Sequence, residues 1–104
     1  IMAMTAHIIF KSIDKKNAAT HSSKIIKLVR KIIGFNKIIM TDDISMKSLK
    51  YSIKENTKKA FIAGCNLVLH CNGNYNEMIK VAENSPLISS FILKKTSNLI
   101  NIVR

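Results

Sequence analysis

Tryptophan is absent from this chain of 104 residues, and all aromatic residues together make up only 6%. Large aromatic side chains therefore cannot dominate the core, which we expect to be aliphatic and mostly isoleucine. With 47% hydrophobic and 22% charged residues, the composition is typical of a globular protein rather than a disordered one. The length suits one small domain, and no linker or low-complexity segment divides it.

Acidic residues are also scarce. Six Asp and Glu face 17 Lys and Arg, which gives a formal net charge of +11. This charge suggests nucleic acid, but only Arg30 and Arg104 are arginines, and the lysines are scattered along predicted helix faces. Specific recognition of nucleic acid relies on arginine forks and stacking aromatic residues, and neither is clustered here. We therefore expect no nucleic-acid partner, and a basic binding module remains a weaker alternative.

Cysteine occurs only twice, as Cys65 and Cys71. Six residues of strand would separate the two by roughly 20 Å, too far for a disulfide, so we expect free, buried thiols in a reducing compartment. A zinc site needs paired Cys or His residues at ligand spacing, and Cys65, His70 and Cys71 do not offer such pairs. Nothing else in the sequence indicates a metal or other cofactor. No apolar run approaches the roughly 20 residues of a membrane span, and no leader is evident. These features favour a cytoplasmic protein with no membrane partner.

Three apolar runs at intervals of about thirty residues predict strands over 1–6, 37–41 and 66–71. Helical periodicity follows each of them. The first helix begins after Ser22 or Ser23 and turns its apolar stripe inward, with Gly34 at its left-handed end and Lys24, Lys27, Arg30 and Lys31 on the outer face. The stripe consists of Ile25, Leu28, Val29, Ile32 and Ile33.

The later helices have equally clear signals. We expect one over 50–63, with Ile53, Ala60 and Phe61 inward, a Glu55–Lys59 ion pair and Gly64 as its stop. Asn74 and Glu77 form a capping box for the next helix, with Met78, Ile79 and Ala82 inward. Ser85-Pro86 then begins the last helix, since proline suits the first helical position.

Strand, helix, strand at this spacing defines βα units and an α/β fold with a parallel sheet. The run over 37–41 is apolar throughout, as in a strand buried on both faces. Three strands do not close a barrel, which takes about 250 residues. The chain is therefore either a small open sheet or a fragment of something larger, and its opening within a strand favours a fragment.

The strongest candidate for chemistry is Asp42-Asp43, directly after the central strand. In open α/β sheets and in (β/α) barrels, functional groups lie at the carboxyl ends of the strands. Adjacent carboxylates also raise each other's pKa, so such a pair is costly unless it has a use. Position alone singles out the pair and not one of its members. The structural alternative is a helix N-cap or supporting role, for which Asp43 is the better candidate.

Several short motifs follow one another along the chain. They are Met4–His7, Ile13-Asp14, Asn17, Ala19-Thr20, Ser22, Gly34-Phe35, Met40–Met46 and Ala63-Gly64. In these motifs the chain resembles the family 3 glycoside hydrolases, and most of all the single-domain bacterial β-N-acetylglucosaminidases (β-N-acetylhexosaminidases) of cell-wall recycling. The family's patterns are MTAH, IDP-x-NPATLS, LGFDGVV-x-SDDL-x-M and AG-x-D-x-x-L, in the same order, although Ala18 stands where the family has proline. The resemblance implies that residues 1–104 are the last three βα units and C-terminal helix of a partial TIM (β/α)₈ barrel.

The resemblance also implies a mechanism. Asp42 matches the nucleophile of a retaining hydrolase that removes terminal β-N-acetylglucosamine from peptidoglycan-derived muropeptides. The acid/base, a histidine on a loop, lies in the part of the family's barrel that these residues do not include. A separately encoded N-terminal part is therefore an implied partner beside the amino-sugar substrate. His7 is expected to line the sugar site, and His70 either touches the cleft or makes only a local bond.

One further alternative is a receiver-like signalling module that holds Mg²⁺ at an acidic pair. It would need a third Asp and a Lys at other strand ends, where this chain has His7 and His70 or Cys71. On the hydrolase hypothesis, the isolated chain should be inactive.

Overall fold

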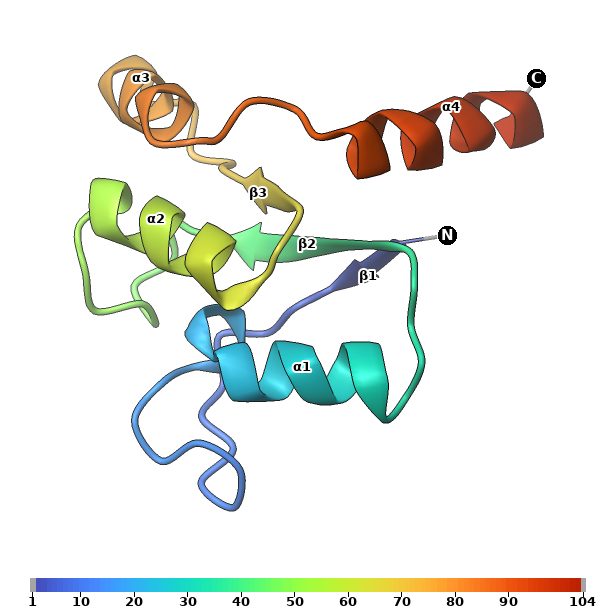
Figure 1. Ribbon diagram of the computed structural model, residues 1–104. Helices are drawn as coiled ribbons and strands as arrows, with labels where there is room; N and C mark the ends of the chain where they lie inside the picture. The colour runs from blue at the N-terminus through green and yellow to red at the C-terminus, as the bar shows by residue number, and fades with distance from the viewer. Residues whose placement is uncertain (1, 104) are drawn as a thin grey trace.

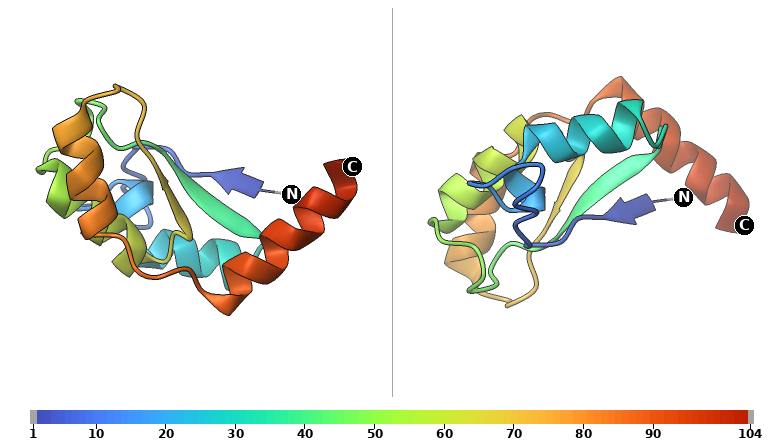
Figure 2. Two further views of the ribbon diagram at one scale, coloured as in Figure 1. Left: turned by 90° about the horizontal axis from the view of Figure 1, so that it is seen from above. Right: turned by 90° about the horizontal axis from the view of Figure 1, so that it is seen from below.

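A computed structural model describes residues 2–103, which form a three-stranded parallel sheet in the order β1-β2-β3. The elements are β1 (Met2–Met4), the short 3₁₀ helix η1 (Ala19–His21), α1 (Ser23–Lys31), β2 (Ile38–Asp43), α2 (Ile53–Ala63), β3 (Leu67–Leu69), α3 (Tyr75–Glu83) and α4 (Ser90–Val103). The predicted βα units and parallel sheet are thus confirmed. The helices lie in an arc along one side of the sheet (Figures 1 and 2).

The strands differ from their predicted lengths. β2 continues through Asp43, so both carboxylates belong to its last two positions rather than following it. β1 and β3 are shorter than expected, with three residues each, and Ile1 lies outside the described residues. In the register of the sheet, Met2 pairs with Ile38 and Met40 pairs with Leu67, and an irregularity follows between Met40 and Asp43. Because all three strands are parallel, their carboxyl ends meet at one edge.

The core lies between β2 and the first two helices. Ile26 of α1, Ile39 of β2 and Ala60, Ala63 and Cys65 from α2 and its end form one buried cluster. Gly64 closes α2 with φ +115°, as the sequence predicts, and a Cβ there would come within 2.8 Å of Ile26 Cγ2. The glycine therefore serves both the turn and the close approach of α1 to α2.

Helix α1 begins as predicted, with the Ser22 hydroxyl accepting the Ile25 N–H at 3.3 Å. It ends at Lys31, before Gly34, which has φ +75°. The expectation that Ile32 and Ile33 face the core is wrong, because Ile32 is 81% exposed and Ile33 is 67% exposed. Both come after the helix has ended, and residues 2–103 contain no further helix beside β1 that could cover them.

Arg30 is not a solvated outer-face residue, as its helical position had suggested. Its guanidinium donates to the Phe35 and Lys37 carbonyls and, at 2.6 Å, to Asn66 Oδ1, which also accepts the Ile39 N–H at 2.9 Å. The half-buried side chain thus joins the end of α1 to the start of β2. Its burial lowers the pKa of the guanidinium.

Helix α2 begins at Ile53, three residues later than predicted, because Ser52 caps it by accepting the Glu55 N–H at 3.3 Å. The predicted Glu55–Lys59 ion pair is absent among the described residues. The Lys59 ammonium lies instead over the Tyr51 ring, 4.4 Å from its centroid. Ala60 is buried as expected, and Ile53 and Phe61 are half-buried.

The predictions for the last two helices are partly wrong. Asn74 does cap α3, but Glu77 does not return the bond, because its carboxylate contacts His70 and Asn72. No residue of α3 is buried, so Met78, Ile79 and Ala82 do not face a core. Helix α4 begins at Ser90 rather than Ser85-Pro86, since the Ser85 hydroxyl bonds the Val81 carbonyl and completes α3.

Both outer edges of the sheet are unpaired within residues 2–103. Beside β1, a groove of about 450 Å³ is lined almost entirely by apolar side chains of β1, the loop after it, α1 and β2. Helix α4 extends away from the sheet (Figure 1), and only its Ile92 is buried. Within residues 2–103, no helix is long and apolar enough to cross a membrane.

Candidate active site

Asp43 is tied to the loops around it. Its Oδ1 accepts the Ser45 N–H at 3.0 Å and the Cys71 N–H at 3.1 Å, and both carboxylate oxygens accept the Ser45 hydroxyl at 2.8 Å. Burial raises the pKa of the carboxyl, but these hydrogen bonds outweigh burial and lower the pKa below its ordinary value. The side chain therefore fastens the ends of β2 and β3 together and has little capacity left for a ligand.

Asp42 is the less occupied of the two carboxylates. Its Oδ1 accepts the N–H of Asp43 at 2.8 Å, and within residues 2–103 Oδ2 has no hydrogen-bond partner. The residue is half-buried and belongs to the carboxyl end of the central strand. It does not cap a helix, since α2 has Ser52 for that purpose. One carboxylate oxygen is thus held in place by the backbone, and the other has no donor from the described residues.

His7 lies beside this pair, at the loop that follows β1. Its Nε2 is 2.8 Å from the Asp43 carbonyl oxygen, and its Nδ1 is 2.8 Å from Thr20 Oγ1. Because a carbonyl only accepts, Nε2 carries a proton. Both ring nitrogens are used within the protein, so His7 could meet a sugar only through its carbon edge. Its observed role is to hold the backbone at Asp43.

The loop between His7 and α1 is organised by two residues for which sequence reasoning gave no role. The buried Asp14 carboxylate accepts the Ser22 hydroxyl at 2.7 Å, the Lys16 and Asn17 N–H groups, and the Asn17 amide. Led by the Ser22 bond, these contacts hold the pKa of Asp14 far below its usual range. Thr20 is fully buried and bonds Thr5 as well as His7. The signal was available, since an Asp side chain in a turn often accepts the backbone N–H two residues on, which here is that of Lys16.

His70 makes a local bond rather than a contact with Asp42. Its Nε2 is 2.7 Å from Glu77 Oε2, and its side chain is only 6% exposed. This bond, followed by the one from Asn72, lowers the pKa of Glu77. The pair fastens the loop after β3 to α3, and the neighbouring Cys71 N–H reaches Asp43.

Both cysteines are free, as predicted, but they differ in burial. Cys65 is buried, and burial raises the pKa of its thiol to about 12, slightly opposed by Arg30. Cys71 is exposed, contrary to expectation, because it follows β3 in an open loop.

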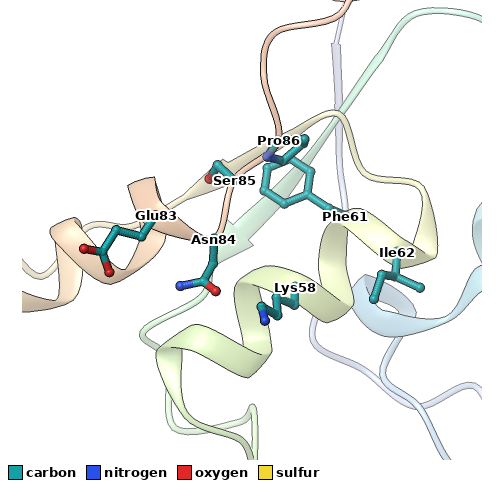
Figure 3. A pocket seen from close by; sticks show the side chains of 7 residues that line it. All are labelled: Lys58, Phe61, Ile62, Glu83, Asn84, Ser85 and Pro86. Atoms are coloured by element: carbon teal, nitrogen blue, oxygen red, sulfur yellow. The ribbon is translucent and has the colours of Figure 1, made fainter.

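One groove lies away from the carboxyl end of β2. It has a volume of about 540 Å³ and is formed by α2 and the segment that follows α3 (Figure 3). Its lining residues are Lys58, Phe61, Ile62, Glu83, Asn84, Ser85 and Pro86. Neither Asp42 nor His7 belongs to it, so it is not the site that the strand ends define.

Parallel strands with helices along one side define a segment of a (β/α) barrel, and Asp42 belongs to the carboxyl end of its central strand. Comparison with known proteins agrees. Residues 1–102 match the family model of the glycosyl hydrolase family 3 N-terminal domain, and the chain belongs to that family.

Similar sequences and structures carry related names. The chain is 35% identical over 71 residues to a beta-hexosaminidase of Neisseria meningitidis and 37% identical over 71 residues to one of Glaesserella parasuis, in each case across 66% of the chain. Its fold matches the beta-N-acetylglucosaminidase of Thermotoga maritima over 97% of the chain, with a TM-score of 0.66 and 26% identity. The match to CbsA of Thermotoga neapolitana has a TM-score of 0.78 at 21% identity and shows the fold alone.

These relatives are much longer. The aligned part spans 20% and 21% of the two curated sequences, and the chain covers 24% of the Thermotoga maritima structure and 26% of CbsA. The described βα units therefore correspond to one part of a larger barrel.

Proposed function

We propose that residues 1–104 are the C-terminal part of a family 3 glycoside-hydrolase barrel that releases terminal β-N-acetylglucosamine, and that Asp42 is its nucleophile. The observation that carries this proposal is the contrast between the two carboxylates. Asp43 is engaged by three donor groups, whereas Asp42 Oδ2 has no partner in the described chain. The β-hexosaminidase and β-N-acetylglucosaminidase names of its relatives support the sugar.

In the proposed reaction, the Asp42 carboxylate attacks the anomeric carbon as the bond to the leaving oxygen breaks. Water then hydrolyses the glycosyl–aspartate ester, so the sugar keeps its configuration. The nucleophile has to be ionised and fixed, and the Asp43 N–H bond to Oδ1 fixes it. His7 supports the site indirectly, because its Nε2–H holds the Asp43 carbonyl.

Protonation of the leaving oxygen needs a second group. Among the described side chains, His7 and His70 are engaged by Thr20 and Glu77, which leaves neither as a ready acid. We propose that the acid and the groups that grip the sugar come from the other units of the barrel. Without them, leaving-group protonation and positioning are lost, each worth orders of magnitude in rate, so the chain alone should be inactive.

A chimera tests the role of Asp42. The segment 2–103 would replace the matching part of the Thermotoga maritima enzyme, and turnover of a chromogenic N-acetylglucosaminide would be measured. Asp42→Asn should reduce turnover on the order of 10⁴-fold or more, since loss of one member of a catalytic unit has effects of that size. Asp43→Asn is the matched control and should keep most of the turnover. Equal losses would show that the roles are assigned wrongly.

The open edges of the sheet indicate where the remaining units attach. Because βα crossovers are right-handed, a helix preceding β1 would lie on the same side of the sheet as α1. The apolar groove beside β1 is in that position, lined by Met4, Ile25, Val29 and Ile33 among others. We propose that this helix fills the groove, whether it is encoded in the same chain or separately.

Light scattering tests this arrangement. Unpaired apolar edges recruit other chains, so the 104-residue protein should self-associate. Co-expression with the N-terminal units of a relative should convert it to a defined heterodimer with glycosidase activity. A monomer whose own turnover is abolished by Asp42→Asn would contradict the need for those units.

The substrate and location complete the proposal. We propose muropeptides derived from peptidoglycan as the source of the sugar, and the cytoplasm as the compartment, consistent with two free cysteines. Comparing hydrolysis of muropeptides and of unbranched chitin fragments by the heterodimer would test the substrate.

A further inference from the structure

A second, smaller cavity lies at the same edge of the sheet as Asp42, between the loop after β1 and the loop after β2. It has a volume of about 90 Å³. Its lining residues are His7, Ile9, Lys16, Asn17, Ala18, His21, Ser48, Leu49, Lys50 and Tyr51. Asp42 is not among them, so the cavity is separate from the proposed nucleophile.

The lining contains cationic groups and no carboxylate. Lys16 and Lys50 contribute two ammonium groups, and neither forms an ion pair within the described chain. The nearest carboxylate in sequence, Asp14, is turned to Ser22, Asn17 and the Lys16 N–H, and does not line the cavity. Two exposed lysines without an ion pair in the described chain therefore border the cavity.

His21 contributes an imidazole to the lining of the cavity. Its Nε2 is 3.2 Å from the Asn56 carbonyl oxygen, and its ring lies 6.0 Å from the Tyr51 ring, which Lys59 covers on a face. Burial lowers the pKa of His21, as do the nearby charges of Lys59 and His7, although the Asn56 bond opposes them. A negative charge in the cavity would relieve this repulsion and favour the imidazolium.

We propose that this cavity binds a tetrahedral oxyanion of the phosphate class, free or as a monoester, between Lys16, His21 and Lys50. A cavity of about 90 Å³ is large enough to hold ordered water, and a group of the size of phosphate fits the same space. Ammonium groups form short, charge-assisted hydrogen bonds to such oxygens, and the Ser48 and Tyr51 hydroxyls supply neutral donors. The proposal does not depend on glycosidase activity.

Calorimetry on the 104-residue chain tests the site, with inorganic sulfate as the probe because it is a dianion that does not titrate near neutral pH. Titrations at constant ionic strength, balanced with chloride, should show one saturable site per chain. Repeating them near pH 6.5 in buffers of different ionisation enthalpy should reveal proton uptake, since the bound dianion raises the pKa of His21. His21→Gln should abolish this uptake.

The lysines provide the matched comparison. Lys16→Gln with Lys50→Gln should weaken sulfate binding at least about tenfold, because a hydrogen bond to a charged group accounts for a factor of this size. Lys24→Gln with Lys27→Gln removes the same charge from the exposed face of α1 and should change the affinity less than about twofold, since salt screens distant charges. All four side chains are exposed, so the fold should survive, as circular dichroism would check.

Three results would overturn the proposal. The first is the absence of a saturable site, and the second is an equal loss in both lysine pairs, which would mean that sulfate responds only to net charge. The third is proton uptake that persists in His21→Gln. Inorganic phosphate at a fixed pH should compete with sulfate, and failure to compete would exclude the phosphate class.

Discussion

Gly64 is the position where a single methyl group should have the largest effect on stability. It ends α2 with φ +115°, a backbone conformation that residues with a Cβ rarely adopt, and its Cβ would meet Ile26 Cγ2 at 2.8 Å. Ile26 is 4% exposed and belongs to the core cluster, so it has little room to move. Two separate penalties therefore apply to Gly64→Ala.

The two penalties can be separated with Gly34→Ala. Gly34 also has a positive φ, +75°, but a Cβ there meets nothing within 4 Å. A left-handed conformation costs an L-residue about 1–2 kcal/mol, partly offset by the lower entropy of unfolded alanine, so Gly34→Ala should lose about 1 kcal/mol. Overpacking adds about 1–3 kcal/mol, which gives a total of about 2–4 kcal/mol for Gly64→Ala.

Denaturant unfolding followed by circular dichroism would measure both variants at one fixed protein concentration, because self-association makes stability depend on concentration. The ratio of the two losses is the critical result. If Gly64→Ala loses no more than Gly34→Ala, the close packing of α2 on Ile26 is wrong.

Three further outcomes are expected. Ala18 has φ −59° and ψ 153°, and its N–H has no backbone partner among residues 2–103, so proline fits this position. Ala18→Pro should therefore raise the free energy of unfolding, measured with denaturant, by about 0.4–1 kcal/mol. A lower free energy of unfolding would mean that the loop needs another conformation. Folding lowers the pKa values of Asp14, Asp43 and Glu77. These carboxylates therefore stabilise the fold at any pH above their unfolded pKa values, which are near 4. The stabilisation is lost as the pH falls through the folded-state pKa values. Acid titration of unfolding should therefore show a decline below about pH 5 that is shallower in Asp14→Asn, and an unchanged slope would remove Asp14 from this account. A thiol reagent should label the exposed Cys71 in the native chain and Cys65 only after denaturation; a thiol count that rises with reductant would indicate a disulfide instead.

Local signals in the sequence identified most of the architecture. Strand spacing, the Ser22 cap and the Gly64 helix end depend on residues close in sequence, and each is found where predicted. Gly34 has the predicted left-handed conformation although α1 already ends at Lys31, and Asp42-Asp43 form the last two positions of β2 rather than following it. Parallel pairing also followed, because strand–helix–strand units of this length allow few other arrangements.

The errors fall where partners lie far apart in the chain. Ile33 and Met78 have the correct helical or near-helical spacing for a core, yet they are exposed because no element of the described chain packs over them. The helical position of Arg30 predicts a solvated side chain, yet the fold brings its guanidinium within 2.6 Å of Asn66 Oδ1.

The distinction between the two carboxylates was likewise a tertiary result. From the sequence, Asp42 and Asp43 are neighbours of the same type at the end of one strand. Folding brings the Cys71 N–H to the Asp43 carboxylate and the His7 ring to the Asp43 carbonyl. It leaves one carboxylate oxygen of Asp42 without a partner among the described residues. The sequence alone determined that an acidic pair ends the central strand. Only the packing of the strand ends at one edge completed the distinction, because the Cys71 N–H that reaches the Asp43 carboxylate and the His7 ring that reaches the Asp43 carbonyl lie 28 and 36 residues away.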